Sequence, residues 1–356
     1  MRGLLPVLIH ALSISLIISQ DYPKKKFYKR EKHAAKIMGR DDRKYGDHSG
    51  NRVLCRFYNH GSIGDQSSSF SGVYPIGSGH SYIWEFSPVV AASVVDTNGF
   101  RRHIVSDGIS GLVDASPEGT PWSFEPLSGY SNPNQENLAM SDNENSWPNS
   151  WPNRTEDWNG EWNGQYGKYV RADQESYFVV DDRYNSEFEF WPDQNDIPED
   201  PTVSPDEHRR GLGIEMEARG YQWNHPAAED IIIVTYWITN VGSSVLDSVV
   251  FGMYGDADIG GASSFSDDDA WFDTENDMVY QWDHDNWSSS YGGFRPAYFG
   301  WSFLESPGNP HDGIDNDGDG MIDESQFDGV DNDGDWDPER DDIGADRKST
   351  RLNSSH

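Results

Sequence analysis

This 356-residue sequence has a single cysteine and far fewer basic than acidic residues. Cys55 stands alone, so no disulfide can form within the chain. Lys and Arg number 27 against 61 Asp and Glu, and between Tyr45 and Ala345 the counts are 13 and 56. A chain this acidic repels phosphate groups. We therefore expect no nucleic acid partner.

Catalytic motifs are also missing. The sequence has no Gly-x-Ser-x-Gly elbow, no His-Glu-x-x-His pair and no phosphate-binding loop. His284, between Asp283 and Asp285, is a candidate acid–base or metal residue, although a solvated histidine is the commoner outcome in so acidic a segment. Because carboxylate pairs leave no spacing signature, a polysaccharide hydrolase stays open as an alternative.

Long apolar runs are absent after residue 20. The run from Leu4 to Ile18 follows Met1-Arg2 and is too short to span a bilayer. We expect residues 1–20 to be a secretory signal peptide, with an uncleaved membrane anchor as the alternative. The mature protein is then secreted or held on the outer cell surface, and it does not span a membrane.

Two further segments differ from the rest of the chain. Residues 21–50 carry ten basic residues between Lys24 and Lys44. We expect a disordered leader there, the alternative being a basic tail that touches an acidic surface. Residues 346–356, DRKSTRLNSSH, resemble the translation of a common sequencing adapter, and we expect them to be an artefact.

The clearest chemistry lies in residues 307–345, where Asp-Gly-(Ile/Val)-Asp-Asn-Asp-Gly-Asp begins at Asp312 and again at Asp328. Carboxylates at alternate positions with glycines between them are typical of a calcium loop, because this hard cation takes six to eight oxygens. We therefore expect Ca²⁺ as a cofactor. The expected ligands are Asp315, Asp317, Asp319, the Met321 carbonyl and Asp323 in the first copy, and Asp331, Asp333, Asp335 and Asp337 in the second.

This repeat is not an EF-hand, because Gln326 stands where the closing Glu is required and no helical periodicity flanks the loop. The segment resembles instead the aspartate repeats of the thrombospondin type 3 class, which bind calcium in tandem. The second copy departs from that pattern, since Trp336 replaces a glycine. A solvated acidic linker is the alternative.

Residues 51–306 are expected to form an all-β sandwich with long loops, as one large domain or two small ones. Residues 214–219, IEMEAR, alternate apolar and charged side chains, and no stretch of ten residues after Lys44 sustains a helical face. Further runs are short, β-branched or aromatic: residues 81–86, 89–95, 103–105, 177–180, 188–191, 231–239 and 245–254. The last two are expected to pair as a hairpin, the first of them as a central strand.

A second calcium site is predicted directly after this expected hairpin. Asp256 and Asp258 lie on one side of the chain in the sequence GDADIG. Five more carboxylates follow closely: Asp267, Asp268, Asp269, Asp273 and Asp277. So many carboxylates at a strand end are typical either of a calcium site or of a solvated loop.

Residues 146–164, SWPNSWPNRTEDWNGEWNG, are expected to be a long loop because proline and glycine exclude a helix. It carries Trp147, Trp151, Trp158 and Trp162. Exposed indole rings of this kind stack on sugar rings, so an extracellular glycan is a candidate ligand. In the alternative, the rings fold back and cover a sheet.

Four segments, YPIGSGHSY at 74–82, GYQW at 220–223, DIIIVTYWITN at 230–240 and GDADIG at 255–260, resemble a group of large, uncharacterised exported proteins of Bacteroidetes-like and marine bacteria. The resemblance covers much of residues 53–324. It implies export linked to type 9 secretion and brings no established activity. Together these patterns predict a calcium-stabilised extracellular β-sandwich with a structural, adhesive or glycan-binding role on a cell surface.

Overall fold

The computed structural model describes residues 9–18, 43–64, 71–110, 115–117, 119, 122–195, 197, 208–261, 264–274 and 276–305, of which 9–18, Phe265 and Glu305 are described by backbone alone. The predicted calcium ligands between Asp315 and Asp337 lie outside these residues, as does the tail at 346–356. Those predictions therefore stay predictions.

The described chain is built from strands, which confirms the all-β prediction. The strands are β1 (Ile9–Ile18), β2 (Tyr45–His48), β3 (Cys55–Tyr58), β4 (Ile83–Val95), β5 (Arg101–Asp107), β6 (Glu125–Pro126), β7 (Ala139–Met140), β8 (Gln174–Asp181), β9 (Ile214–Gln222), β10 (Ile232–Asn240), β11 (Asp247–Ala257), β12 (Asp268–Asp273), β13 (Met278–Asp283) and β14 (Tyr298–Glu305). Helical structure in this part of the chain is limited to short 3₁₀ turns: η2 (Glu144–Ser146), η3 (Glu156–Trp158), η4 (Phe265–Asp267) and η5 (Ser290–Gly292). No helix among the described residues is long and apolar enough to cross a membrane.

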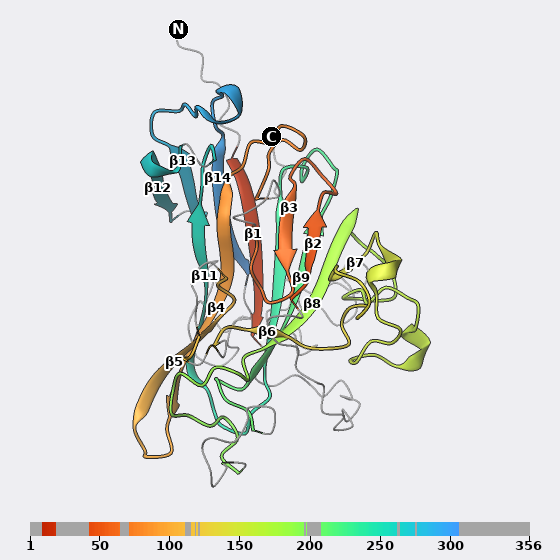
Figure 1. The fold of residues 1–356 in the computed structure, drawn as a ribbon, viewed down its shortest axis with the longest axis vertical. Coiled ribbons are helices and arrows are strands. Elements are labelled where there is room, and N and C mark those ends of the chain that lie inside the picture. Colours follow the sequence, from red (N-terminus) through yellow and green to blue (C-terminus); the bar gives the residue numbers. More distant parts are fainter. Residues whose placement is uncertain are drawn as a thin grey trace, which may run out of the picture.

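Nine strands form the main sheet, in the order β12-β13-β14-β1-β10-β9-β8-β6, with β7 also paired to β8. A smaller sheet has the order β11-β4-β5, and β2 pairs with β3. Neighbouring strands run antiparallel except at β1, which is parallel to both β10 and β14. In Figure 1, β12 lies at one side of the molecule and β7 at the other.

The main and smaller sheets face each other across one hydrophobic core, giving a two-layered, sandwich-like arrangement. Its buried side chains include Val90, Ala92 and Ile104 from the smaller sheet and Met216, Ala218, Val234 and Tyr236 from the main sheet. The rings of Tyr236 on β10 and Phe251 on β11 meet across the two layers, with centroids 5.2 Å apart. Alternation of apolar residues along β9 and β10 supplies this face, because successive side chains of a strand point to opposite sides.

The expected hairpin between residues 231–239 and 245–254 is wrong. β10 is central, as expected, but it pairs with β9 and β1, whereas β11 pairs with β4 in the other sheet. The connection through Val241 to Leu246 therefore carries the chain from one layer to the other. The short Gly-containing loop is compatible with both outcomes, and after the crossing the half-buried Phe251 and Met253 of β11 pack against the main core.

Two other strand predictions need correction. Residues 188–191 are not a strand, and the two predicted runs 81–86 and 89–95 form the single strand β4. Pro88 does not interrupt β4 because β5 pairs with it only from Val89 onward. A proline lacks a backbone N–H and is tolerated where a neighbouring strand has ended.

Both faces of β8 are buried. Phe178 and Val180 join the main core, while Tyr177 and Val179 join a second hydrophobic cluster on the outer face of the main sheet. That second cluster contains Leu127, Tyr130, Ala139, Trp151, Trp162, Tyr177 and Val179, with Trp147 and Trp158 packed against it. The tryptophan-rich loop therefore covers the sheet at β8.

The polar edges of these indole rings are satisfied within the protein. Trp162 is 2% exposed, and its Nε1 donates to Glu175 Oε2 at 2.7 Å. Trp151 is 3% exposed and donates to the Glu161 carbonyl at 2.9 Å, while Trp147 donates to the Met140 carbonyl at 2.7 Å. Rings packed in this way have no free face for a sugar, so the structure favours the sheet-covering alternative for Trp151 and Trp162.

Two segments near the N-terminus are more ordered than the sequence suggests. Residues 45–48, at the end of the expected leader, form β2, and the side chain of Arg56 fixes it through Asp47 at 2.6 Å. Residues 9–18, inside the predicted signal peptide, form β1 in the middle of the main sheet. The signal peptide remains a prediction, and the position of β1 is taken up below.

The second cluster generates a stability prediction. Trp162→Ala should lower the free energy of unfolding by about 3–5 kcal/mol, because it removes a buried ring and the donor to Glu175 Oε2. Trp271→Ala is the matched control, since that ring is 63% exposed and its loss should change the unfolding free energy by at most about 0.5 kcal/mol. Urea denaturation of both variants measures the difference. A Trp162 variant as stable as the control would mean that the loop does not cover the sheet.

A pH prediction follows from His48, a fully buried residue whose Nε2 lies 2.8 Å from Ser176 Oγ. Burial lowers the pKa of His48 to about 3. The unfolded chain therefore takes up this proton near pH 6.5, whereas the folded chain does not. Stability from this residue is present above pH 6.5 and is lost as the pH falls toward 3, with a loss of about 2 kcal/mol at pH 5.

In His48→Gln the free energy of unfolding should fall less between pH 7 and pH 5 than in the wild type, whatever the effect of the substitution at neutral pH. Urea midpoints at pH 7 and pH 5 give the slope, and His103→Gln, at an exposed position, controls for the substitution itself. Equal slopes in the wild type and in His48→Gln would contradict a neutral, buried His48.

Candidate metal centre

Carboxylates from three parts of the chain meet at one end of the β11–β13 region. Asp258 follows β11, Asp267 ends η4, Asp268 begins β12 and Asp283 ends β13. The turn after β11 contains Gly260 and Gly261 with φ of +85° and +82°, which other residues rarely adopt. This turn returns the chain so that Asp268 lies against the segment just after β11.

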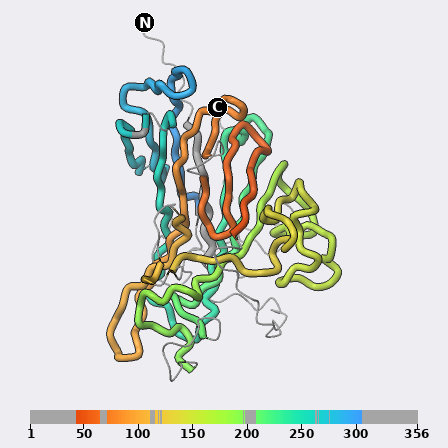
Figure 2. The backbone as a smooth tube through the Cα atoms, viewed as in Figure 1, coloured from red at the N-terminus to blue at the C-terminus, as the bar shows by residue number. Residues whose placement is uncertain are grey.

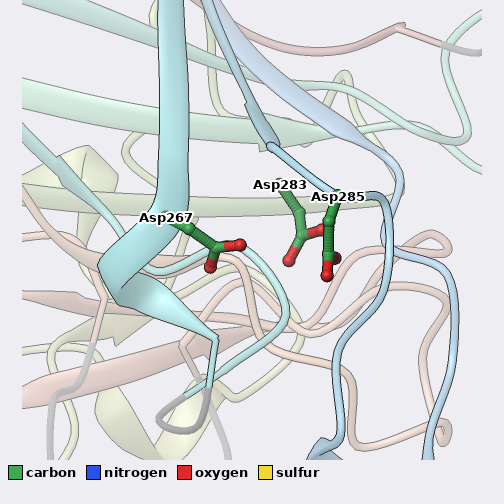
Figure 3. Close-up of side chains that lie close together, drawn as sticks. All are labelled: Asp267, Asp283 and Asp285. Carbon is green, nitrogen blue, oxygen red and sulfur yellow. The ribbon is translucent and has the colours of Figure 1, made fainter.

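Asp267, Asp283 and Asp285 form the tightest group. Each offers one carboxylate oxygen, and these oxygens lie within 4.8 Å of one another. Figure 3 shows the three side chains gathered around one space, Asp267 from the turn η4 and the other two from the end of β13 and the turn after it. Oxygens on opposite sides of a calcium ion lie about 4.6–5.2 Å apart, twice the usual ligand distance. The spacing therefore suits one bound cation.

Hydrogen bonds hold Asp283 in place. It is 3% exposed, its Oδ2 accepts from Ser264 Oγ at 2.6 Å, and its Oδ1 accepts from the Trp287 N–H at 2.7 Å. The carboxylate is thus oriented by two donors before any ligand binds. Such outer contacts are what fix the geometry of a metal ligand.

Asp258 and Asp268 add buried oxygens that have no hydrogen-bond partner. Asp258 is 8% exposed and its Oδ1 is unpaired. Asp268 uses Oδ2 to accept from the Ile259 N–H at 2.9 Å, while its Oδ1 is buried and unpaired. A buried carboxylate oxygen without a donor is costly, and it calls for a proton, a water molecule or a cation.

The raised pKa values of Asp258 and Asp268 also favour a cation at this position. Burial, followed by the charges of Asp283, Asp258 and Asp267, raises the pKa of Asp268 to about 7, against the opposing hydrogen bond from Ile259. Burial also raises the pKa of Asp258, with a smaller contribution from the charge of Asp256. Carboxyl groups that resist ionisation because of one another are stabilised when a cation lies between them.

Not every predicted carboxylate joins this group. Of the two residues named first from the sequence, Asp258 lies beside Asp268, whereas the pKa of Asp256 is raised by burial and by the charge of Glu85, against the hydrogen bond with Tyr254. Asp269 instead accepts a hydrogen bond from His284 Nδ1 at 2.7 Å, beside the cluster. Asp273 and Asp277 lie at the other end of the β12–β13 hairpin, because Asp273 pairs with Met278 while Asp268 pairs with Asp283. Five residue steps along β12 therefore place the two ends of the hairpin ~17 Å apart.

The sequence pattern indicates Asp283 and Asp285 only as neighbours of His284, not as ligands. The signal that identifies them is the antiparallel pairing of β12 with β13, which sets Asp268 directly opposite Asp283. His284 itself is exposed, and its hydrogen bond to Asp269 and the surrounding acids raise its pKa. It therefore acts as a partner of Asp269 at the rim of the cluster.

A serine–histidine pair also occurs in the described structure, between Ser176 and His48. Neither side chain is exposed to solvent, and the pair joins β2, which ends at His48, to Ser176 on β8 of the main sheet. A nucleophile needs access to its substrate, so this pair is part of the packing. Of these two groups, the acidic cluster is therefore the candidate functional site.

Comparisons with known proteins give no relative from which a role can be transferred. No protein-family model matches the chain. Searches among curated proteins and among solved structures found no match either.

Proposed function

We propose that this chain is an exported β protein stabilised by calcium, and that the cluster around Asp283 is one of its calcium sites. The observation that carries the proposal is the pair of buried, unpartnered oxygens on Asp258 and Asp268 beside the Asp267–Asp283–Asp285 group. All of these candidate ligands are carboxylate oxygens. Calcium prefers such ligands in sites of six to eight oxygens, whereas zinc prefers nitrogen and sulfur.

The site's position explains why an ion would matter to the fold. Asp258 follows β11, a strand of the smaller sheet, whereas Asp268 and Asp283 belong to β12 and β13 of the main sheet. A cation bound between them links the two layers at one edge of the core. Without it, the charges of the buried Asp258 and Asp283 and the half-buried Asp268 repel one another.

The Asp-rich repeats extend this proposal along the chain. Residues 312–337 have too few apolar side chains to form a core, so calcium is the natural source of order there. A protein with one cysteine and no disulfide gains from such ions outside the cell, where free calcium is abundant.

The proposal for the role of the whole protein rests on the predicted export and on the sequence having no recognised catalytic motif. We infer a structural, adhesive or glycan-binding protein of the cell surface, linked to type 9 secretion by the resemblance noted above. A secreted hydrolase acting on polysaccharide is the alternative. Release of reducing ends from a polysaccharide panel would favour the hydrolase, and retention without release would favour a binding protein.

The calcium site is tested by one substitution measured with and without the ion. At 1 mM free calcium, a site with a dissociation constant of ~10⁻⁴ M stabilises the wild type by about 1.4 kcal/mol over its chelated form. Asp268→Asn should lose most of that gain. In excess EDTA the same variant should be at least as stable as the wild type, because it removes one of the repelling charges.

Asp277→Asn is the control, since it removes an exposed carboxylate from the far end of the same hairpin. It should leave the calcium effect unchanged. The free energy of unfolding from urea titrations measures all three proteins in both conditions. If Asp268→Asn keeps the full calcium effect, calcium acts elsewhere in the chain and the cluster is not its site.

A further inference from the structure

The strand β1 occupies a distinctive place in the main sheet. It lies between β10 and β14, and it is parallel to both, whereas the other strand pairs of the described structure are antiparallel. Seven residues of β1, Leu12 to Ile18, are in register with Ile232 to Ile238 of β10. On the other side, Ile9 to Ile14 are in register with Tyr298 to Phe303 of β14.

The sequence of β1 matches the pattern of its neighbour. From Leu12 to Leu16 apolar residues alternate with serine, and apolar positions of β1 are in register with the buried residues of β10: Leu12 with Ile232, Ile14 with Val234, Leu16 with Tyr236 and Ile18 with Ile238. Ile17 departs from the alternation and is in register with the half-buried Trp237. Ser13 and Ser15 are in register with the half-buried Ile233 and Thr235. In a sheet, residues in register share a face. The position therefore selects a strand with alternating apolar residues.

The two neighbours of β1 are each held from their far side. β9 pairs with β10 along eight residues, and β13 pairs with β14. Phe299 and Trp301 of β14 also pack on Phe86 of β4, with ring centroids 5.2 and 4.7 Å apart. β10 and β14 are thus fixed on either side of a gap one strand wide.

The floor of this gap is apolar. The described side chains leave a hollow between Ile232 and Phe299, bordered also by Tyr82, Ile83 and Ala297. Without a strand above it, this hollow would face water, and the backbone N–H and C=O groups of β10 and β14 that point into the gap would lose their partners.

β1 is also the segment that the sequence identifies as a signal peptide, with a cleavage point expected between Ser19 and Tyr22. We propose that the gap between β10 and β14 is a strand-binding slot. Residues 9–18 fill it in the uncleaved chain, and after cleavage it takes an extended peptide with apolar residues at alternate positions. Strand addition of this kind draws affinity from backbone hydrogen bonds and selectivity from alternate side chains.

The first test uses the full chain. Cell-free synthesis without membranes keeps the leader attached, and a protease site inserted after Gln20 allows it to be cut once the protein has folded. The cleaved leader should remain with the protein on gel filtration under native conditions. Immediate separation of the two pieces would overturn the proposal.

The second test is competition by labelled peptides. The peptide IHALSISLII, carrying C-terminal lysines for solubility, should displace the cut leader. A peptide of the same composition with its apolar and serine residues grouped should bind about tenfold more weakly or worse, and so should the Ser13→Pro peptide, which lacks one backbone donor. Equal binding of all three peptides would show unspecific apolar association and would contradict a slot.

Hydrogen exchange then locates the bound peptide. When the cut protein is unfolded in urea, freed of the leader by gel filtration and refolded, exchange at Ile232–Ile238 and Tyr298–Phe303 should be faster, relative to β9, than in the uncut protein, and added IHALSISLII peptide should slow it again. Amides that stay protected in β10 and β14 after the leader has left would mean that these strands close the gap by themselves. This measurement is independent of calcium, so it stands or falls separately from the proposed metal site.

Discussion

A buried carboxylate oxygen must find a donor, a proton or a cation, and Asp258 and Asp268 place two such oxygens at the edge where the two layers of the molecule meet. Their neighbours Asp267, Asp283 and Asp285 are also acidic, so the local charge opposes folding unless something positive lies between them. The proposed calcium ion would resolve this conflict and link β11 to the β12–β13 hairpin. The chain has one cysteine, so in this proposal ions would take the part that disulfides play in many exported proteins.

Aromatic side chains contribute to both hydrophobic clusters of the described structure. The main core lies between the two sheets, while the tryptophan-rich loop builds a second cluster on the outer face at β8. Toward β12 the outer face carries Tyr280, Trp282 and Tyr298, whose ring centroids lie 5.6–6.1 Å from one another. The sheet is thus rich in aromatic residues across its width. The slot at β1 lies between these two regions, where the order of strands depends on a segment that export is expected to remove.

Local patterns predicted the fold class and several strands, because alternation is visible in short windows, and acidic clustering pointed to the segment that contains Asp258. They failed where the outcome depends on which strand lies next to which. The pattern around Val241 predicts a hairpin loop between β10 and β11, yet β11 pairs with β4. Asp283 became recognisable as a candidate ligand only through its pairing with Asp268 across β12 and β13. The burial of Trp162 likewise depends on its packing against β8 and on its hydrogen bond to Glu175, neither of which is visible in the sequence of the loop itself.

The central claim, that a cation joins the two layers, is tested most directly by a crystal structure of the protein grown in calcium, with anomalous data to identify the ion. The account predicts one calcium peak at about 2.3–2.6 Å from oxygens of Asp283 and Asp268, with Asp258, Asp267 and Asp285 completing the shell directly or through water. It is contradicted if that space holds only water or a side chain from elsewhere in the molecule while calcium is bound at other positions in the same crystal.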